Sequence, residues 1–194
     1  MQECEPKGTF LDNKSNIDKI LNAVAFAAEK HKSQRRKGTV AAPYINHPIA
    51  VAKLVTGVGK EYDINVIQGA ILHDTIEDTE TTAEELLGLF GYEVTDYVVE
   101  MTDDKSLPKS ERKRLQVVNA PHKSQGAKLI KICDKICNIT DVTNDPPTHW
   151  NLQRRKEYLD WAKQVVDALG EVNEDLGSLF IERYNRGKVL LNAD

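Results

Sequence analysis

Apolar residues recur at intervals of three and four positions along nearly the whole chain. In the first long segment they stand at Ile17, Ile20, Leu21, Val24 and Ala28. This spacing places apolar side chains on one face of an α-helix. No segment shows the alternation of apolar and polar residues that a half-buried strand requires. The pattern therefore predicts an all-α bundle of about eight to ten helices.

Residues at the ends of the apolar segments predict where the helices begin and end. Ser, Thr, Asp and Asn side chains cap the first free amides of a helix, and Gly commonly follows its last turn. Helices are predicted to begin near Ser15 or Asn16, Pro48, Asp63, Thr81-Thr82 and Pro108. They are predicted to end at Gly91, Pro146-Pro147, Gly170 and Gly187.

The length and composition indicate one globular domain. The chain has 194 residues, of which 40% are hydrophobic and 29% charged, and its net charge is −4. A chain of this length buries enough surface on folding to need no disulfide or structural metal. We expect residues 1–14 to form a disordered tail and residues 15–194 to form a single domain.

Neither a membrane span nor a secretory signal is expected. No run approaches the ~18 consecutive apolar residues of a membrane helix, and the N-terminus lacks the apolar core of a signal peptide. The cysteines form no CxxC pair, and Cys133 and Cys137 lie on an apolar stripe, as core residues do. These features favour a cytoplasmic protein, and the mild acidity argues against nucleic acid binding. The sequence leaves open whether the chain forms a homo-oligomer.

The segment GAILHDTIEDT, residues 69–79, combines an apolar helix with four ionisable side chains. His73 and Glu77 stand one helical turn apart, and so do Asp74 and Asp78. Charged groups of this density cannot all be buried without partners. Two of them can therefore ligate a metal ion while the carboxylates of the next turn face its bound water.

Two further residues, distant in sequence, can complete such a metal site. His47 stands at the start of another predicted helix, and Asp134 is the one acid in an apolar and basic stripe. A mixed set of His and carboxylate ligands suits a divalent ion such as Mn²⁺ or Fe²⁺. Taken singly, His47 also fits a capping role and Asp134 a salt bridge with Lys131 or Lys135. The prediction of a metal site rests on the four residues together and on their order along the chain.

A basic cluster precedes His47 and spans residues 30–37, including Arg36 and Lys37. Arginine binds phosphate through a two-pronged contact and stacks on flat rings, so this cluster can hold a nucleotide. Cations also favour a helix C-terminus, and a solvated helix end remains the simpler interpretation of the cluster taken alone.

The motifs NHP, HD and a late DKxxN, in that order, resemble the HD superfamily of metal-dependent phosphohydrolases. More narrowly, RRKGTVAAPYINHP, ILHDTIEDT and DKICN are similar to the hydrolase domain of the RelA/SpoT alarmone enzymes, above all to its stand-alone metazoan form. The likeness covers roughly residues 17–187. It implies an HD-domain helical bundle.

The resemblance also implies roles for individual residues. One Mn²⁺ per chain is expected on His47, His73, Asp74 and Asp134, with Glu77 and Asp78 placing or activating the attacking water. Substrate contacts are expected from Arg36, Lys37, Tyr44, Lys109, Asn138, Arg154 and Tyr158. One position departs from the family pattern, because Thr140 stands where members often carry an arginine.

The expected activity is hydrolysis of (p)ppGpp, with pyrophosphate released from the 3′ position. One alternative keeps the chemistry and acts on the 2′-phosphate of NADPH, and another acts on cyclic or deoxynucleotides. A third is a nucleotide-binding regulator without catalysis, against which the intact Glu77-Asp78 pair argues. In each case the expected partner is a small nucleotide.

Overall fold

The computed structural model describes residues 10–193, which form ten α-helices and one short 3-10 helix. The helices are α1 (Phe10–Lys30), α2 (Asn46–Gly57), α3 (Ile64–Leu72), α4 (Thr75–Asp78), α5 (Ala83–Phe90), α6 (Tyr92–Met101), α7 (Lys109–Asn119), η1 (Ala120–His122), α8 (Gln125–Asn144), α9 (Leu152–Leu169) and α10 (Glu174–Ala193). No extended strand occurs in this range. The all-α prediction is confirmed.

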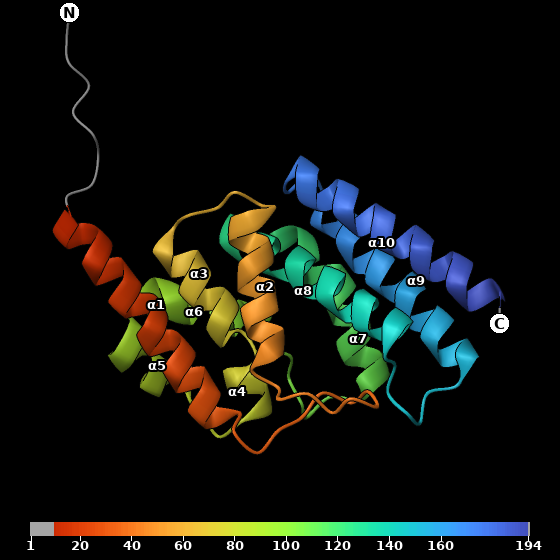
Figure 1. Ribbon diagram of the computed structural model, residues 1–194, viewed down its shortest axis with the longest axis horizontal. Helices are drawn as coiled ribbons and strands as arrows, with labels where there is room; N and C mark the ends of the chain where they lie inside the picture. Colours follow the sequence, from red (N-terminus) through yellow and green to blue (C-terminus); the bar gives the residue numbers. More distant parts are fainter. Residues whose placement is uncertain (1–9, 194) are drawn as a thin grey trace, which may run out of the picture.

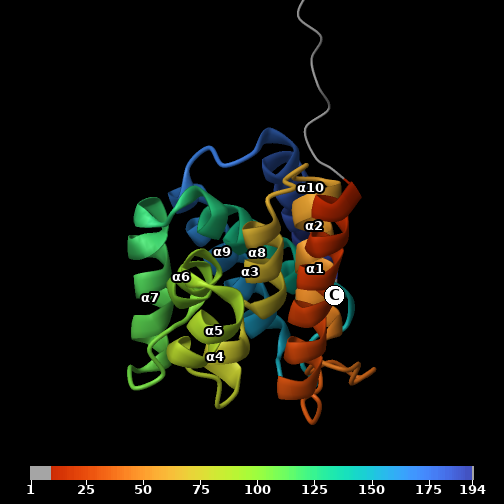
Figure 2. The same ribbon diagram turned by 90° about the vertical axis from the view of Figure 1, so that its left-hand side faces the viewer.

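Helix α8 is the central element of the bundle. Apolar side chains such as Ile130, Cys133 and Ile139 are fully buried along its length. It packs against α2 and α3 on one side and against α9 and α10 on the other (Figure 1). Helices α1 and α7 lie at opposite edges, with α3, α6 and α8 between them (Figure 2). Residues on α8 can therefore meet side chains from most of the bundle.

Several predicted helix ends are confirmed in atomic detail. The side chain of Asp63 accepts a hydrogen bond from the Asn65 amide at 2.8 Å, which caps α3. Thr82 caps α5 by accepting from the Glu85 amide at 3.2 Å. Gly91, with φ of 82°, ends α5, and the left-handed conformation there favours glycine.

Other predicted ends are wrong. Helix α1 begins at Phe10 rather than at Ser15 or Asn16, so residues 10–14 are helical, while residues 1–9 of the predicted tail lie outside the described range. Gly187 does not end α10, which runs to Ala193. A Cβ atom on Gly187 would lie 2.6 Å from Leu159 Cδ2, so glycine is needed there for close packing of α10 against α9.

A break between α3 and α4 replaces the continuous helical turn expected across residues 73–78. His73 terminates α3, and Asp74 precedes α4. The hydroxyl of Thr75 donates to the Leu72 carbonyl at 2.7 Å across the break. The chain thereby turns at the two residues that carry the expected metal ligands.

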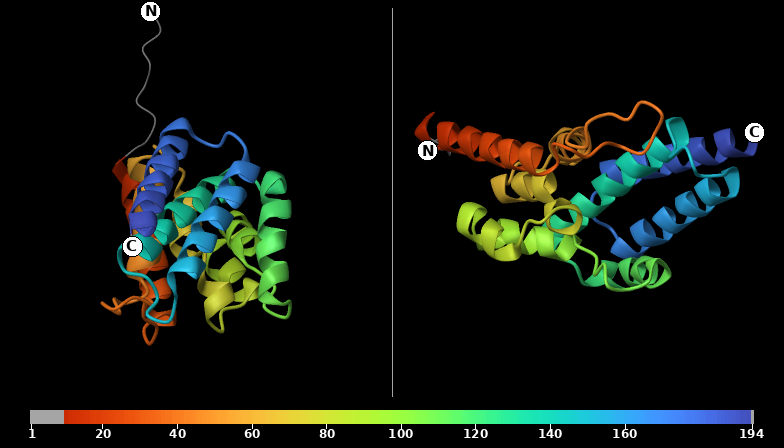
Figure 3. Two further views of the ribbon diagram at one scale, coloured as in Figure 1. Left: turned by 90° about the vertical axis from the view of Figure 1, so that its right-hand side faces the viewer. Right: turned by 90° about the horizontal axis from the view of Figure 1, so that it is seen from below.

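The loop of residues 31–45 joins α1 to α2 and crosses the C-terminal end of α8 (Figure 3, right). Arg35 and Pro43 form an isolated antiparallel bridge within the loop. At its tip the Thr39 amide and hydroxyl both donate to Asp145, at 2.7 and 2.6 Å. The basic cluster is therefore anchored to α8. No helix in the described range is long and apolar enough to cross a membrane.

Candidate metal centre and substrate cavity

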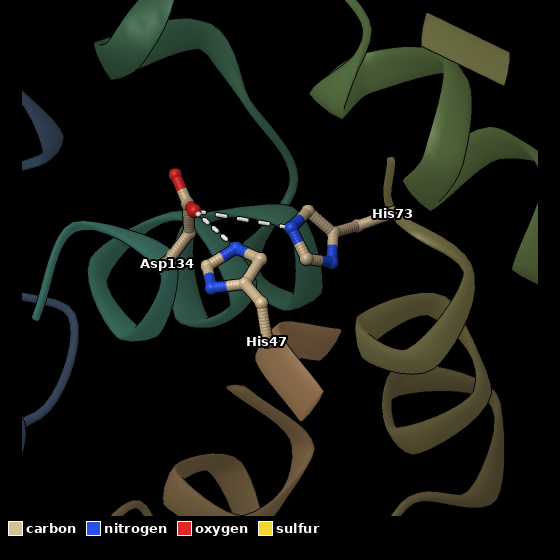
Figure 4. Close-up of side chains that lie close together, drawn as sticks. All are labelled: His47, His73 and Asp134. Carbon is tan, nitrogen blue, oxygen red and sulfur yellow. Dashed lines mark ion pairs between the residues drawn. The ribbon is translucent and has the colours of Figure 1, made fainter. Parts of the chain in front are cut away.

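Three helical segments bring His47, His73 and Asp134 together. His47 is in the first turn of α2, His73 terminates α3, and Asp134 lies in the middle of α8. One ligand atom from each residue lies within 4.8 Å of the others. Asp134 Oδ1 is 3.2 Å from His47 Nε2 and 3.8 Å from His73 Nε2 (Figure 4). All three side chains are buried.

Asp74 stands at the edge of this cluster. Its Oδ2 is 3.2 Å from His73 Nε2 and 3.7 Å from His47 Nε2. The break after His73 is what turns the Asp74 carboxylate back toward the imidazoles. Tyr44 fixes it from the other side by donating its hydroxyl to Asp74 Oδ2 at 2.7 Å. The fourth expected ligand therefore points at the same space as the other three.

The hydrogen bonds of His73 fit a metal ligand. Its Nδ1 lies 2.7 Å from the Ala70 carbonyl, which can only accept, so Nδ1 carries the proton. In the neutral imidazole, the form that binds a metal, this leaves a lone pair on Nε2, which is buried and has no hydrogen-bond partner in the described structure. Metal-bound histidines are commonly oriented by such a bond from the second ring nitrogen. The His/Asp group could therefore bind a metal ion.

The charges around the cluster also call for a cation. Burial alone would lower the pKa of His73, but Asp74 and Asp134 raise it to about 9, so without an ion the imidazole carries a second proton, which a bound metal ion would displace. Despite burial, His73 holds the pKa of Asp74 well below its usual range. The nearby Lys135 ammonium does the same for Asp134. Two ionised carboxylates thus converge on one small volume, where a divalent ion would neutralise them.

Glu77 and Asp78 project from α4 beside the cluster. Glu77 Oε2 accepts a hydrogen bond from the Asp103 amide at 3.1 Å, and burial raises the pKa of Glu77. Asp78 pairs with Lys105 at 2.6 Å and accepts from the Tyr44 hydroxyl at 3.2 Å. Of the two carboxylates, Glu77 therefore has fewer partners.

A cavity of about 550 Å³ opens over the His/Asp cluster. The predicted site residues on its walls are Arg36, Lys37, Tyr44, His47, Asp74, Glu77, Asp78, Lys109, Asp134, Asn138 and Tyr158. Arg36 binds Asn138 Oδ1 at 3.0 Å and Asp141 Oδ2 at 2.6 Å. Its guanidinium also lies 5.5 Å from the centre of the Tyr44 ring. A cationic, aromatic wall thus faces the acidic cluster.

Arg154 lies apart from the main cavity. It lines an adjoining pocket of about 460 Å³, whose walls also include Lys109 and Tyr158. The Arg154 guanidinium covers the Trp150 ring, 4.6 Å from its centre. Burial and the charge of Arg154 lower the pKa of Lys109. The two pockets therefore share a wall, on which Lys109 and Lys113 carry positive charge.

Sequence reasoning missed several cavity residues, namely Arg112, Lys113, Gln116, Lys131, Lys135, Trp150 and Trp161. A helical face could have revealed Trp161, since Arg154, Tyr158 and Trp161 follow each other by four and three positions. In the same way Lys131 and Lys135 share a face of α8 with Asn138. Thr140, in place of the family arginine, donates to the Ile136 carbonyl at 2.7 Å within its own helix.

Comparison with known proteins places these residues in a family. The family model described as HD domain matches residues 23–160. The zebrafish (Danio rerio) and human (Homo sapiens) proteins named guanosine-3′,5′-bis(diphosphate) 3′-pyrophosphohydrolase MESH1 are 50% and 51% identical to the chain. They align with 88% and 84% of it and with 97% and 90% of their own lengths. A solved structure of a metazoan orthologue of SpoT, described as hydrolysing ppGpp, superposes with a TM-score of 0.84 at 43% identity, covering 87% of this chain and 94% of its own. The chain therefore belongs to the HD-domain family.

Proposed function

We propose that this protein hydrolyses (p)ppGpp and releases pyrophosphate from the 3′ position, with one Mn²⁺ per chain. The observation that carries the proposal is the convergence of His47, His73, Asp74 and Asp134 beneath a cavity with cationic and aromatic walls. The names of the relatives at about half identity support the same substrate. The proposal includes a cytoplasmic location for this activity.

The four ligands suit Mn²⁺ because they combine imidazole and carboxylate without a thiolate. When bound, the ion supplies Lewis acidity, which polarises a phosphoryl oxygen and acidifies a water molecule. The protein holds the ligands ready. Ala70 orients His73, Tyr44 orients Asp74, and Asn138 Nδ2 donates to Asp134 Oδ1 at 2.6 Å.

In the proposed reaction the oxygen of a water molecule forms a bond to the phosphorus next to the ribose 3′ oxygen. The bond between that phosphorus and the 3′ oxygen breaks, the 3′ oxygen takes up a proton, and pyrophosphate leaves. Glu77 accepts the proton of the water, since it lies at the cavity edge with a raised pKa. Asp78 places the water from the next position on α4.

The remaining predicted residues hold the nucleotide. Arg36 and Tyr44 stack against the base, and Lys37 and Asn138 position the ribose and its 3′ group. On the shared wall of the two pockets, Lys109, Arg154 and Tyr158 contact the 5′ phosphates. Positioning and charge neutralisation of this kind supply most of the rate in phosphoryl transfer.

A substrate panel tests the proposal. Purified protein is loaded with Mn²⁺ and incubated with ppGpp, NADPH, a cyclic dinucleotide and a deoxynucleoside triphosphate, and the products are separated by chromatography. We expect GDP and pyrophosphate from ppGpp, in equal amounts. If NADPH were the one compound of the panel to release phosphate, the protein would be a 2′-phosphatase. Binding of ppGpp without turnover would identify a regulator.

A further inference from the structure

One wall of the cavity, which we call the rear wall, carries a charge that the proposed reaction does not use. It consists of Met101, Asp103, Gln116 and Lys131. Gln116 Nε2 donates to Asp103 Oδ2 at 2.6 Å, and the Asp103 amide donates to Glu77 at 3.1 Å. The rear wall is therefore continuous with the proposed general base.

Lys131 is buried on this wall without a direct ion pair in the described part of the chain. Its residue surface is only 3% exposed, and its Nζ has one contact, the Met101 carbonyl at 3.4 Å. It forms no ion pair within the described part of the chain. Burial and the neighbouring Lys135 outweigh the opposing effect of the more distant carboxylates of Asp134 and Asp103, and they lower the pKa of Lys131 to about 8. A buried ammonium without an anion is costly, so the position favours a bound anion.

The position of Lys131 on α8 places a bound anion close to the His/Asp cluster. Lys131 precedes the ligand Asp134 by three residues, which is about 4.5 Å along the helix axis. Lys135 Nζ, one turn further, lies 3.1 Å from Asp134 Oδ2 and is already paired. Arg112 also lines the cavity, and its Nε is buried without a partner in the described structure. Positive charge that no direct ion pair neutralises in the described structure thus lies next to the cluster.

We propose that Lys131 binds the terminal phosphate of the 3′-diphosphate, the phosphate that a ribose monophosphate lacks. This inference rests on the proposed function, because the phosphorus under attack must lie beside the His/Asp cluster. The terminal phosphate then extends to the rear wall, where Lys131 neutralises it in the substrate and in the pyrophosphate product. Lys131 thereby selects a diphosphate over a monophosphate.

The test compares two nucleotides that differ only in that phosphate, guanosine 3′,5′-bis(diphosphate) and guanosine 5′-diphosphate 3′-monophosphate. In manganese-loaded protein, Lys131→Met should lower kcat/KM about 10–100-fold for the first and less than about threefold for the second. Inhibition by pyrophosphate should weaken similarly, and inhibition by orthophosphate should not change. Lys131→Arg, which retains the charge, should retain the preference. Lys128→Met, on the same helix outside the cavity, is the matched control.

Equal losses on both nucleotides would overturn the role of Lys131, as would an unchanged preference. Failure of the proposed function is distinguishable, because the wild type would then cleave neither nucleotide. Calorimetric binding of pyrophosphate to the wild type and to Lys131→Met needs no turnover. Weaker binding by the variant supports the anion site, and equal binding contradicts it. Should Lys131→Met not fold, Lys131→Gln provides the same comparison.

Discussion

At the scale of single residues, Glu77 and Asp78 are neighbours with different partners. Asp78 is fixed by Lys105 and Tyr44, whereas Glu77 accepts one hydrogen bond, from the Asp103 amide. Burial raises the pKa of Glu77, which strengthens it as a proton acceptor. A carboxylate that is already paired gains less from accepting a proton, so Glu77 is the stronger candidate for the base.

Replacing Glu77 by glutamine tests this assignment. Glu77→Gln should lower kcat by about 10²–10⁴-fold, because the amide cannot take the proton of the attacking water. Metal content, measured by mass spectrometry of the intact protein, should not change. Glu84→Gln, in the exposed first turn of α5, is the matched control. A loss below about tenfold at normal metal content would transfer the role to Asp78.

The same substitution should affect stability in a pH-dependent way. Because the pKa of Glu77 is higher in the folded chain than in the unfolded chain, ionisation of Glu77 costs folding free energy. Metal-free Glu77→Gln should therefore melt at a higher temperature than the wild type at pH 7. The advantage should disappear as the pH falls below the pKa of Glu77 and both side chains become neutral. A constant difference between pH 4 and 8, seen by calorimetry, would contradict this explanation.

At the scale of structural elements, the loop of residues 31–45 is attached to α8 by the residues that should hold the substrate. Arg36 binds Asn138 and Asp141, and Thr39 binds Asp145. All three acceptors lie on the last two turns of α8 or directly after it. The loop is thereby held over the cavity before a nucleotide binds, which lowers the entropy cost of ordering it.

Arg36→Lys tests whether this attachment includes base stacking. Lysine lacks the planar fork, so kcat/KM for ppGpp should fall about 5–150-fold, which corresponds to roughly 1–3 kcal/mol. A small phosphate ester without a base should lose much less, and metal content should stay the same. Arg114→Lys, whose guanidinium pairs with Glu111 on the exposed side of α7, is the control. Equal losses on both substrates would refute stacking.

Local chemistry accounts for the features that could be predicted from sequence. Asp63, Thr82 and Gly91 act on backbone groups within a few residues, so their identity alone indicates a helix end. Gly187 misled because its function is close packing against Leu159, which lies 28 positions earlier and was invisible to local reasoning.

The members of the His/Asp cluster could be predicted because a histidine or acid in an apolar segment is conspicuous. Asp134 stands out for this reason, and the structure does place it with His47 and His73. Lys131 was less conspicuous, because lysines are common in helices; its burial and its place on the same face of α8 as Asn138 mark it. Arg154 was predicted to contact the substrate, and it lines the smaller pocket that adjoins the main cavity.

At the scale of the whole molecule, the His/Asp cluster connects elements that are separated in sequence. His47 comes from α2, His73 and Asp74 from the junction of α3 and α4, and Asp134 from the central helix α8. Beyond α8, the helices α9 and α10 complete the bundle (Figure 3, left). Without an ion its two ionised carboxylates are paired with His73 and Lys135, and a divalent cation that binds only the folded chain would add to the stability of the fold.

Chelation should therefore destabilise the entire bundle and not only the site. An ion present at 100 times its dissociation constant stabilises the folded state by about 2.7 kcal/mol. For a chain of this size that amounts to a change in Tm of roughly 5–10 °C. Calorimetry with Mn²⁺ and after chelation should show this difference in the wild type.

His73→Ala should show almost no response to Mn²⁺, because the Nε2 atom that would bind the ion has been removed. His122→Ala, at an exposed position on η1, should respond like the wild type. An equal response in all three proteins would mean that the ion binds elsewhere, and the cluster would then be a buried ion-pair network.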